Sequence, residues 1–147
     1  MNTENWSALT SRGTVLTTEL NSIASLAYSG LGTAIDNGTN LDVYGVARLS
    51  LTAFGVSPTL DGTIELYALC ALDGANYEDG SSSLRYPQDA LVGVFQVYNN
   101  TSAQLLDCKP FVMNPAKTKF GIFNNTSQAL AASGNTVTLY TFNRVLN

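Results

Sequence analysis

The sequence predicts an all-β protein, an antiparallel β-sandwich of the jelly-roll type with a short N-terminal arm and room for one short helix. Three observations carry this prediction. Segments of alternating apolar and polar residues recur along the chain, turn-forming stretches rich in glycine and asparagine separate them, and the four prolines fall between the segments or toward their ends. Because a strand turns successive side chains to opposite faces, and proline cannot donate to a central ladder, this pattern is typical of strands joined by turns.

The length of the chain fits a single domain. With 147 residues, it is long enough to bury roughly 68 to 70% of its unfolded surface, which suffices for one core. We expect residues 14–147 to form the sandwich domain and residues 1–13 to form the arm that precedes it.

The clearest alternation runs from Leu41 to Ala53, where every second residue is apolar or glycine. This period of two predicts a long, half-buried strand. The stretch 36–40 before it (Asp-Asn-Gly-Thr-Asn) favours a turn, so we expect Tyr28 to Ile35 to pair back on the strand as a hairpin.

Further strands are predicted by the same rhythm at 63–72, 91–98, 104–113, 117–124 and 136–145. In the first of these, one face is expected to point inward, and it consists of Ile64, Leu66, Ala68, Cys70 and Leu72. The stretch from Glu19 to Leu31 is an exception, because its apolar residues recur at helical spacing, although threonines before it and Gly30 within it favour extended or broken structure. A short helix and an irregular strand are both open there.

Composition excludes several classes of function. Charged residues make up only 12% of the chain, the net charge is -4, and the seven lysines and arginines do not cluster. A nucleic-acid partner is therefore not expected. No stretch is long and apolar enough to span a membrane, and the first ten residues do not resemble a cleaved export signal, so we expect a protein that is neither embedded nor exported by that route.

The chain contains no histidine, the commonest general base and metal ligand. We therefore expect no catalytic residues, no cofactor and no enzymatic activity. The two cysteines, Cys70 and Cys108, each lie in an apolar strand context, and we expect free thiols rather than a disulfide.

One acidic segment leaves alternatives open. Asp73, Asn76, Glu78 and Asp79 lie close together between two predicted strands. The interpretation we favour is a polar loop built from turns, but the same oxygens could bind Ca²⁺, or two of the carboxylates could act as a glycosidase pair.

Aromatic residues are the candidates for an interaction surface. On a weakly charged exterior, large rings are readily desolvated against another protein, whereas a carbohydrate platform is the alternative. The interface candidates are Trp6, Tyr44, Tyr77, Tyr86 and Tyr98.

Two regions carry a resemblance to a known group of proteins. The segments 65–69 and 72–80, and then 120–130 followed by 131–137, resemble recurring segments of small virion proteins of tailed bacteriophages. The resemblance implies a jelly-roll or sandwich protein on the capsid exterior, a decoration or cement protein that binds the major capsid protein and copies of itself.

By the same resemblance, the protein would be assembled in the host cytoplasm and located at the virion surface, and the family offers no catalytic residues. The alternative is a carbohydrate-binding or receptor-binding module of a phage fibre. That module would use the loop from Asp73 to Asp79 and nearby tyrosines.

Overall fold

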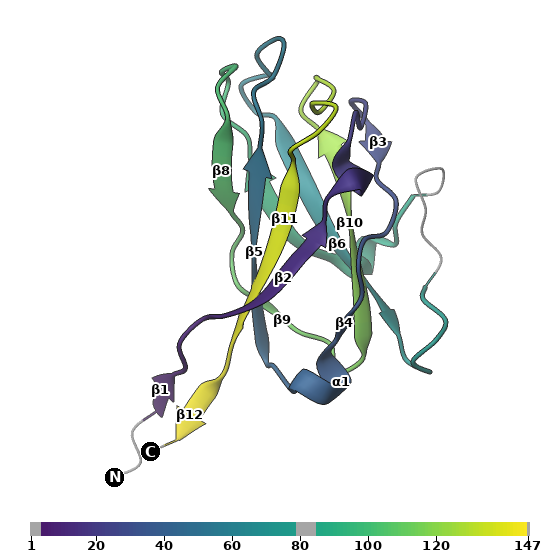
Figure 1. The fold of residues 1–147 in the computed structure, drawn as a ribbon, viewed down its shortest axis with the longest axis vertical. Helices are drawn as coiled ribbons and strands as arrows, with labels where there is room; N and C mark the ends of the chain where they lie inside the picture. Colours follow the sequence, from purple (N-terminus) through teal and green to yellow (C-terminus); the bar gives the residue numbers. More distant parts are fainter. Residues whose placement is uncertain (1–3, 79–84, 147) are drawn as a thin grey trace.

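The computed structural model describes residues 4–78 and 85–146, and it is an antiparallel β-sandwich (Figure 1). One sheet has the order β2 (Thr10–Leu16), β11 (Thr136–Phe142), β5 (Tyr44–Leu51), β8 (Gln104–Asp107), and β9 (Phe111–Val112) also pairs with β5. In the other, β3 (Ala27–Tyr28) and β4 (Ile35–Asp36) both pair with β10 (Lys117–Asn125), followed by β6 (Thr63–Ala71) and β7 (Leu91–Gln96). Each of these two sheets has five strands, and the chain alternates between them in the order typical of a jelly roll. The predicted fold class is therefore confirmed.

The main core lies between the two sheets. Leu49 and Leu139 from one sheet meet Leu66, Phe95 and Phe120 from the other, and all five are fully buried. The alternation predicted for the long central strand is confirmed over β5, where every second residue from Gly45 to Leu51 is buried. It is wrong at the ends, since the strand is shorter than the segment 41–53 and its flanking apolar residues are exposed.

A second, smaller core covers the outer face of the sheet that contains β6, on the side away from the main core. Tyr67 and Leu69 of β6 point away from the main core and pack with Tyr86 and Ala90. Strand β6 is thus buried on both faces, and Ile64 and Leu66 point inward as predicted. Leu72 was predicted to be the last inward residue, but β6 ends at Ala71 and Leu72 is 83% exposed.

The expected hairpin between Tyr28–Ile35 and the central strand does not form. Tyr28 pairs with Phe123 and Ile35 with Thr118, both in β10. The chain then crosses to the other sheet through α1 (Asn37–Asn40), whose N-terminus is capped by Asp36. A crossover in place of a hairpin follows because the two segments belong to opposite layers of the sandwich.

The segment from Glu19 to Leu31 is not an α-helix. The 3-10 helix η1 (Thr18–Leu20) overlaps its start, turns follow, and β3 occupies Ala27–Tyr28. The turns form because Ser22 and Leu26 have left-handed backbone conformations, with φ of 56° and 60°. The buried Asn124 side chain also donates to the carbonyl oxygens of Ile23 and Ala24, which holds these turns in place. A second 3-10 helix, η2, spans Gln88–Ala90.

Two predicted strands are interrupted. The segment 104–113 is split into β8 and β9 around Pro110, which lacks an N–H group. The segment 136–145 is interrupted at Asn143, after which β12 (Arg144–Leu146) pairs with β1 (Glu4–Trp6). This two-stranded ribbon projects from the body (Figure 1). The sheet itself begins at Thr10, so paired backbone starts before residue 14.

Both cysteines are free thiols, as expected. Cys108 is buried and its sulfur accepts a hydrogen bond from the Ala47 backbone N–H at 3.3 Å, whereas Cys70 is half-buried. Burial raises the pKa of both thiols. Neither thiol is therefore set up as a nucleophile.

Candidate interaction surface

The β1–β12 ribbon is held to the sandwich by hydrogen bonds at its base. The Ser7 N–H donates to the Asn143 carbonyl oxygen at 2.9 Å, and the Asn143 N–H donates to the Ser7 hydroxyl at 2.8 Å. The Asn143 side-chain oxygen accepts from the Val43 N–H at 2.7 Å. Further out, Arg144 and Glu4 form an ion pair across the ribbon. The base of the ribbon is thus fixed relative to the start of β5.

Three aromatic rings gather where the ribbon leaves the body. Tyr44 of β5 and Phe142 of β11 are cross-strand partners, and their rings stack with centroids 5.2 Å apart. Trp6 meets both rings edge-on, at 5.6 Å from Tyr44 and 5.5 Å from Phe142. Although it makes both contacts, Trp6 is 63% exposed. Most of the indole surface is therefore available to a partner.

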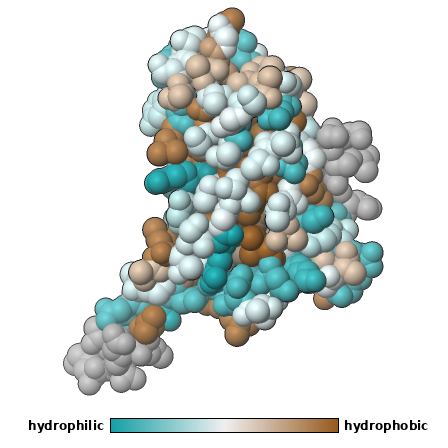
Figure 2. Space-filling view, viewed as in Figure 1, coloured by the Kyte–Doolittle hydropathy of each residue, from teal (hydrophilic) through white to brown (hydrophobic). Residues whose placement is uncertain are grey.

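Leu41 and Val43 are exposed apolar residues that come just before Tyr44 in the chain. Leu41 is 70% exposed and Val43 is 44% exposed. We call the set of Trp6, Leu41, Val43, Tyr44 and Phe142 the ribbon-end surface. Figure 2 shows hydrophobic residues on the ribbon and at the edge of the body above it, as well as others in the middle of the same face.

A partly buried ion pair holds Asp42, the residue between Leu41 and Val43. Arg12 donates from Nε and Nη2 to the two carboxylate oxygens of Asp42, at 2.7 and 2.8 Å, and its Nε also reaches the Thr141 hydroxyl at 3.0 Å. Burial favours a higher pKa for Asp42, but the hydrogen bonds from Arg12 and Thr141 outweigh it and lower the pKa. The charged pair ties β2 and β11 to the segment that carries the exposed leucine and valine.

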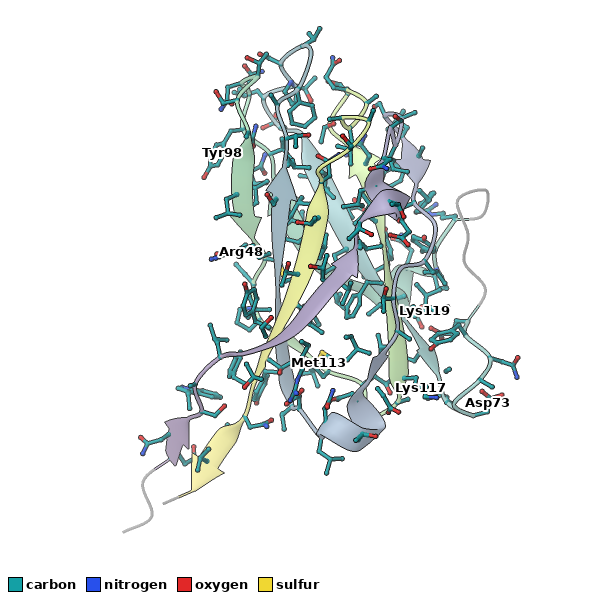
Figure 3. The ribbon with its side chains drawn as sticks, viewed as in Figure 1. Arg48, Asp73, Tyr98, Met113, Lys117 and Lys119 are labelled. Atoms are coloured by element: carbon teal, nitrogen blue, oxygen red, sulfur yellow. The ribbon has the colours of Figure 1, made fainter. Side chains whose placement is uncertain are left out.

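The five aromatic residues predicted to form an interface lie in different parts of the structure. It brings Trp6 and Tyr44 into contact, but the prediction for Tyr86 is wrong, because that residue is only 1% exposed and belongs to the second core. Tyr77 is half-buried under the Lys119 ammonium group, which lies 4.8 Å from the ring centroid. Tyr98 is exposed but lies at the other end of the sandwich from the ribbon (Figure 3).

The acidic segment forms a turn around Asp73. The Asp73 carboxylate accepts hydrogen bonds from the Ala75 and Asn76 backbone N–H groups at 2.9 and 2.7 Å, and from the Asn76 side chain at 2.7 Å. These bonds lower the pKa of Asp73 to about 2. Glu78 is exposed, and Asp79 lies outside the described residues. Within residues 4–78 and 85–146, no three acidic, cysteine or histidine side chains group together as metal ligands.

Sequence reasoning missed three members of the ribbon-end surface, Leu41, Val43 and Phe142. Phe142 ends the alternating segment that predicted β11, and Leu41 was assigned to the inward face of the long strand. The left-handed conformation of Leu41, with φ of 56° and ψ of 34°, ends α1 and turns its side chain out of the strand pattern. The asparagine-rich stretch before Leu41 indicated a turn, but not where that turn would end.

Fold and surface together define the chain as a jelly-roll β-sandwich with a projecting terminal ribbon. No protein-family model matches the chain, and no curated protein matches it. Among the described residues, no helix combines the length and apolar character needed to cross a membrane.

Proposed function

We propose that this chain is a non-enzymatic structural protein that binds another protein through the ribbon-end surface. The observation that carries the proposal is the exposure of Trp6 on a cluster of three rings. Tryptophan and tyrosine are enriched among the residues that dominate binding energy at protein interfaces. Because Tyr44 and Phe142 fix the edge of the indole, a partner would meet a side chain that is already ordered and would lose little entropy on binding.

The conformation of Leu41 supports the same role. A left-handed backbone costs a residue with a Cβ roughly 1–2 kcal/mol, and glycine avoids most of that cost. Leu41 has this conformation and is 70% exposed, so its side chain adds little to the core. A leucine at this position is explained if its side chain is buried by a partner.

The small size of the β1–β12 ribbon also supports binding to a partner. An isolated two-stranded ribbon is marginally stable in water, and the β1–β12 pairing has only three residue pairs. Contact with a partner would bury its apolar residues and stabilise the pairing.

We take the identity of the partner from the resemblance to phage virion proteins. The ribbon-end surface would bind the major capsid protein, and the chain would act as a decoration or cement protein that stabilises the head, with copies of itself as further partners. Self-association has a candidate element in β7, an edge strand of the second sheet without charged residues or proline. The protein would be located on the virion surface after assembly in the host cytoplasm.

Binding to capsids that lack the protein tests the proposal. We expect saturable cosedimentation at a fixed ratio to the major capsid protein and a blue shift of the fluorescence of Trp6, the chain's single tryptophan. Trp6→Ala should weaken binding at least about tenfold, which corresponds to 1.4 kcal/mol.

Tyr98→Ala is the matched control, because Tyr98 is 62% exposed but lies away from the ribbon. The capsid proposal would be abandoned if no binding were observed. If Trp6→Ala and Tyr98→Ala weakened binding equally, the ribbon-end surface would not be the contact.

A second candidate function uses the loops at the opposite end. There Leu26 is 69% exposed with φ of 60°, and Leu60 is 77% exposed. Both lie beside the end of β10, since the Leu26 N–H donates to Asn124 and the Thr59 N–H to Thr126. Exposed loop leucines would suit a receptor-binding module of a phage fibre. Binding to host cells or a glycan array that is lost in Leu26→Ala and kept in Trp6→Ala would favour this function.

A further inference from the structure

A cleft of about 310 Å³ opens between the two sheets beside β9. Both layers contribute to it, because its walls come from β6, β10 and the start of β7 on one side and from β9 and the residues after it on the other. Met113, one of the lining residues, belongs to the main core and is labelled near the middle of the view in Figure 3. Cavities of roughly 300–1,000 Å³ are the usual size of small-molecule sites.

The cleft exists because the first sheet is incomplete here. Strand β8 ends at Asp107, and β9 contributes only two residues against β5. Phe111 then turns toward Phe120 of the opposite sheet, with ring centroids 6.3 Å apart. Gly45 makes room for this arrangement, since a Cβ there would lie 2.7 Å from the Met113 sulfur and 2.8 Å from the Phe111 ring.

The cleft has a mixed lining and an acidic rim. Its accessible apolar surface comes from partly buried Phe111 and from the exposed Leu72 and Val112, whereas Met113 and Phe120 are buried behind it. The charged side chains among the described lining residues are Glu78 and Asp89, both exposed carboxylates. Within the described chain, neither of them takes part in an ion pair.

Cys70 also lines this cleft, so the reactivity of its thiol can show whether the cleft is occupied. Its sulfur lies 3.6 Å from the Thr118 hydroxyl, which in turn donates to the Ala116 carbonyl oxygen at 3.3 Å. Burial raises the pKa of the Cys70 thiol, and the nearby Glu78 carboxylate raises it further. The thiol therefore lies close to the acidic rim and can be protected by a bound molecule.

We propose that this cleft binds a small aliphatic primary amine, with its chain against Leu72, Phe111 and Val112 and its ammonium group between Glu78 and Asp89. An apolar chain gains free energy by leaving water at roughly 25 cal/mol per Å². Two carboxylates without a cationic neighbour in the lining attract a cation and disfavour an anion. A neutral alcohol of the same length would keep the binding free energy from the buried chain but lose the part that comes from attraction to the carboxylates. This site is independent of the proposed capsid contact.

Protection of Cys70 from an aromatic disulfide reagent, which reacts with thiols and not with amines, provides the test. Wild-type protein is labelled at constant pH with n-hexylamine, n-hexanol or n-hexanoate, and mass mapping of peptides separates Cys70 from the buried Cys108. We expect saturable protection of Cys70 by hexylamine. Hexanol should need about a tenfold higher concentration, and hexanoate should protect least.

The double variant Glu78→Gln, Asp89→Asn tests the rim. Both residues are exposed, so folding should be kept, and protection by hexylamine should weaken about tenfold to the level of hexanol. Asp61→Asn, an exposed carboxylate outside the lining, is the control and should leave protection unchanged. Absence of protection by hexylamine, equal protection by hexanol in the wild type, or undiminished protection in the double variant would each overturn the assignment.

Discussion

The ring of Tyr86 occupies the space where a side chain on Gly121 would stand. A Cβ built on Gly121 would lie 2.6 Å from Cζ and 2.7 Å from Cε2 of Tyr86. The Tyr86 hydroxyl also donates a hydrogen bond of 2.5 Å to the Ser29 carbonyl oxygen. A glycine in the centre of β10 therefore lets the segment before η2 close over the outer face of the second sheet.

Gly121→Ala should displace Tyr86 and destabilise the protein. Overpacking a well-packed core costs roughly 1–3 kcal/mol, and we expect a loss of that size in the free energy of unfolding, measured in urea. Gly55→Ala is the control, because nothing lies within 4 Å of a Cβ at Gly55. Equal stability of Gly121→Ala and Gly55→Ala would mean that Tyr86 does not pack against β10.

The same contact shows why part of the fold could be predicted and part could not. The inward faces of β5 and β6 follow from alternation, because the core between two sheets imposes a period of two on each strand. Tyr86 lies outside any strand, so no local pattern marks its burial. Its burial depends on a glycine in a distant strand, and such pairings are not legible in a single sequence.

The candidate surface was predictable to a similar extent. The size and amphipathic character of Trp6 and Tyr44 were sufficient to single them out. Their contact requires β1 and β12, from opposite ends of the chain, to pair beside the start of β5. The exposure of Leu41 depends on one backbone angle at the end of α1.

The Arg12–Asp42 pair should make stability depend on pH. The pKa of Asp42 is lowered in the folded protein, so the unfolded state binds more protons as the solution becomes acidic. The contribution of the pair is therefore present above the ordinary aspartate pKa of about 3.9 and is lost as the pH falls through the lowered value.

Asp42→Asn should reduce the free energy of unfolding at pH 7 by about 2–3 kcal/mol, since the Asp42 side chain is only 4% exposed and its hydrogen bonds are charge-assisted. The difference from wild type should shrink when urea unfolding is repeated below pH 4. Asp61→Asn provides the exposed control. A difference that stayed constant from pH 7 to strongly acidic solution would contradict the assignment.

The turn around Asp73 should not need calcium. Its carboxylate already accepts hydrogen bonds from the Ala75 and Asn76 N–H groups, so Asp73→Ala should speed hydrogen exchange at both amides. Leu72→Ala, at an exposed neighbouring position, should leave those amides unchanged. We expect millimolar calcium to leave the exchange rates and the melting temperature of the wild type unaltered, and a clear rise in melting temperature would restore the calcium interpretation.

Two substitutions at Leu41 separate folding from binding. Leu41→Gly should relieve the left-handed backbone and raise the free energy of unfolding by up to about 1 kcal/mol, while Leu41→Ala should keep the strain and leave stability near the wild-type value. Both remove an exposed side chain of the ribbon-end surface, so both should weaken binding to capsids. Stability is measured by urea unfolding and binding by cosedimentation. A more stable Leu41→Gly protein that bound as tightly as the wild type would show that Leu41 does not contact the partner. The fold would then carry a strained leucine for a reason unrelated to this interface.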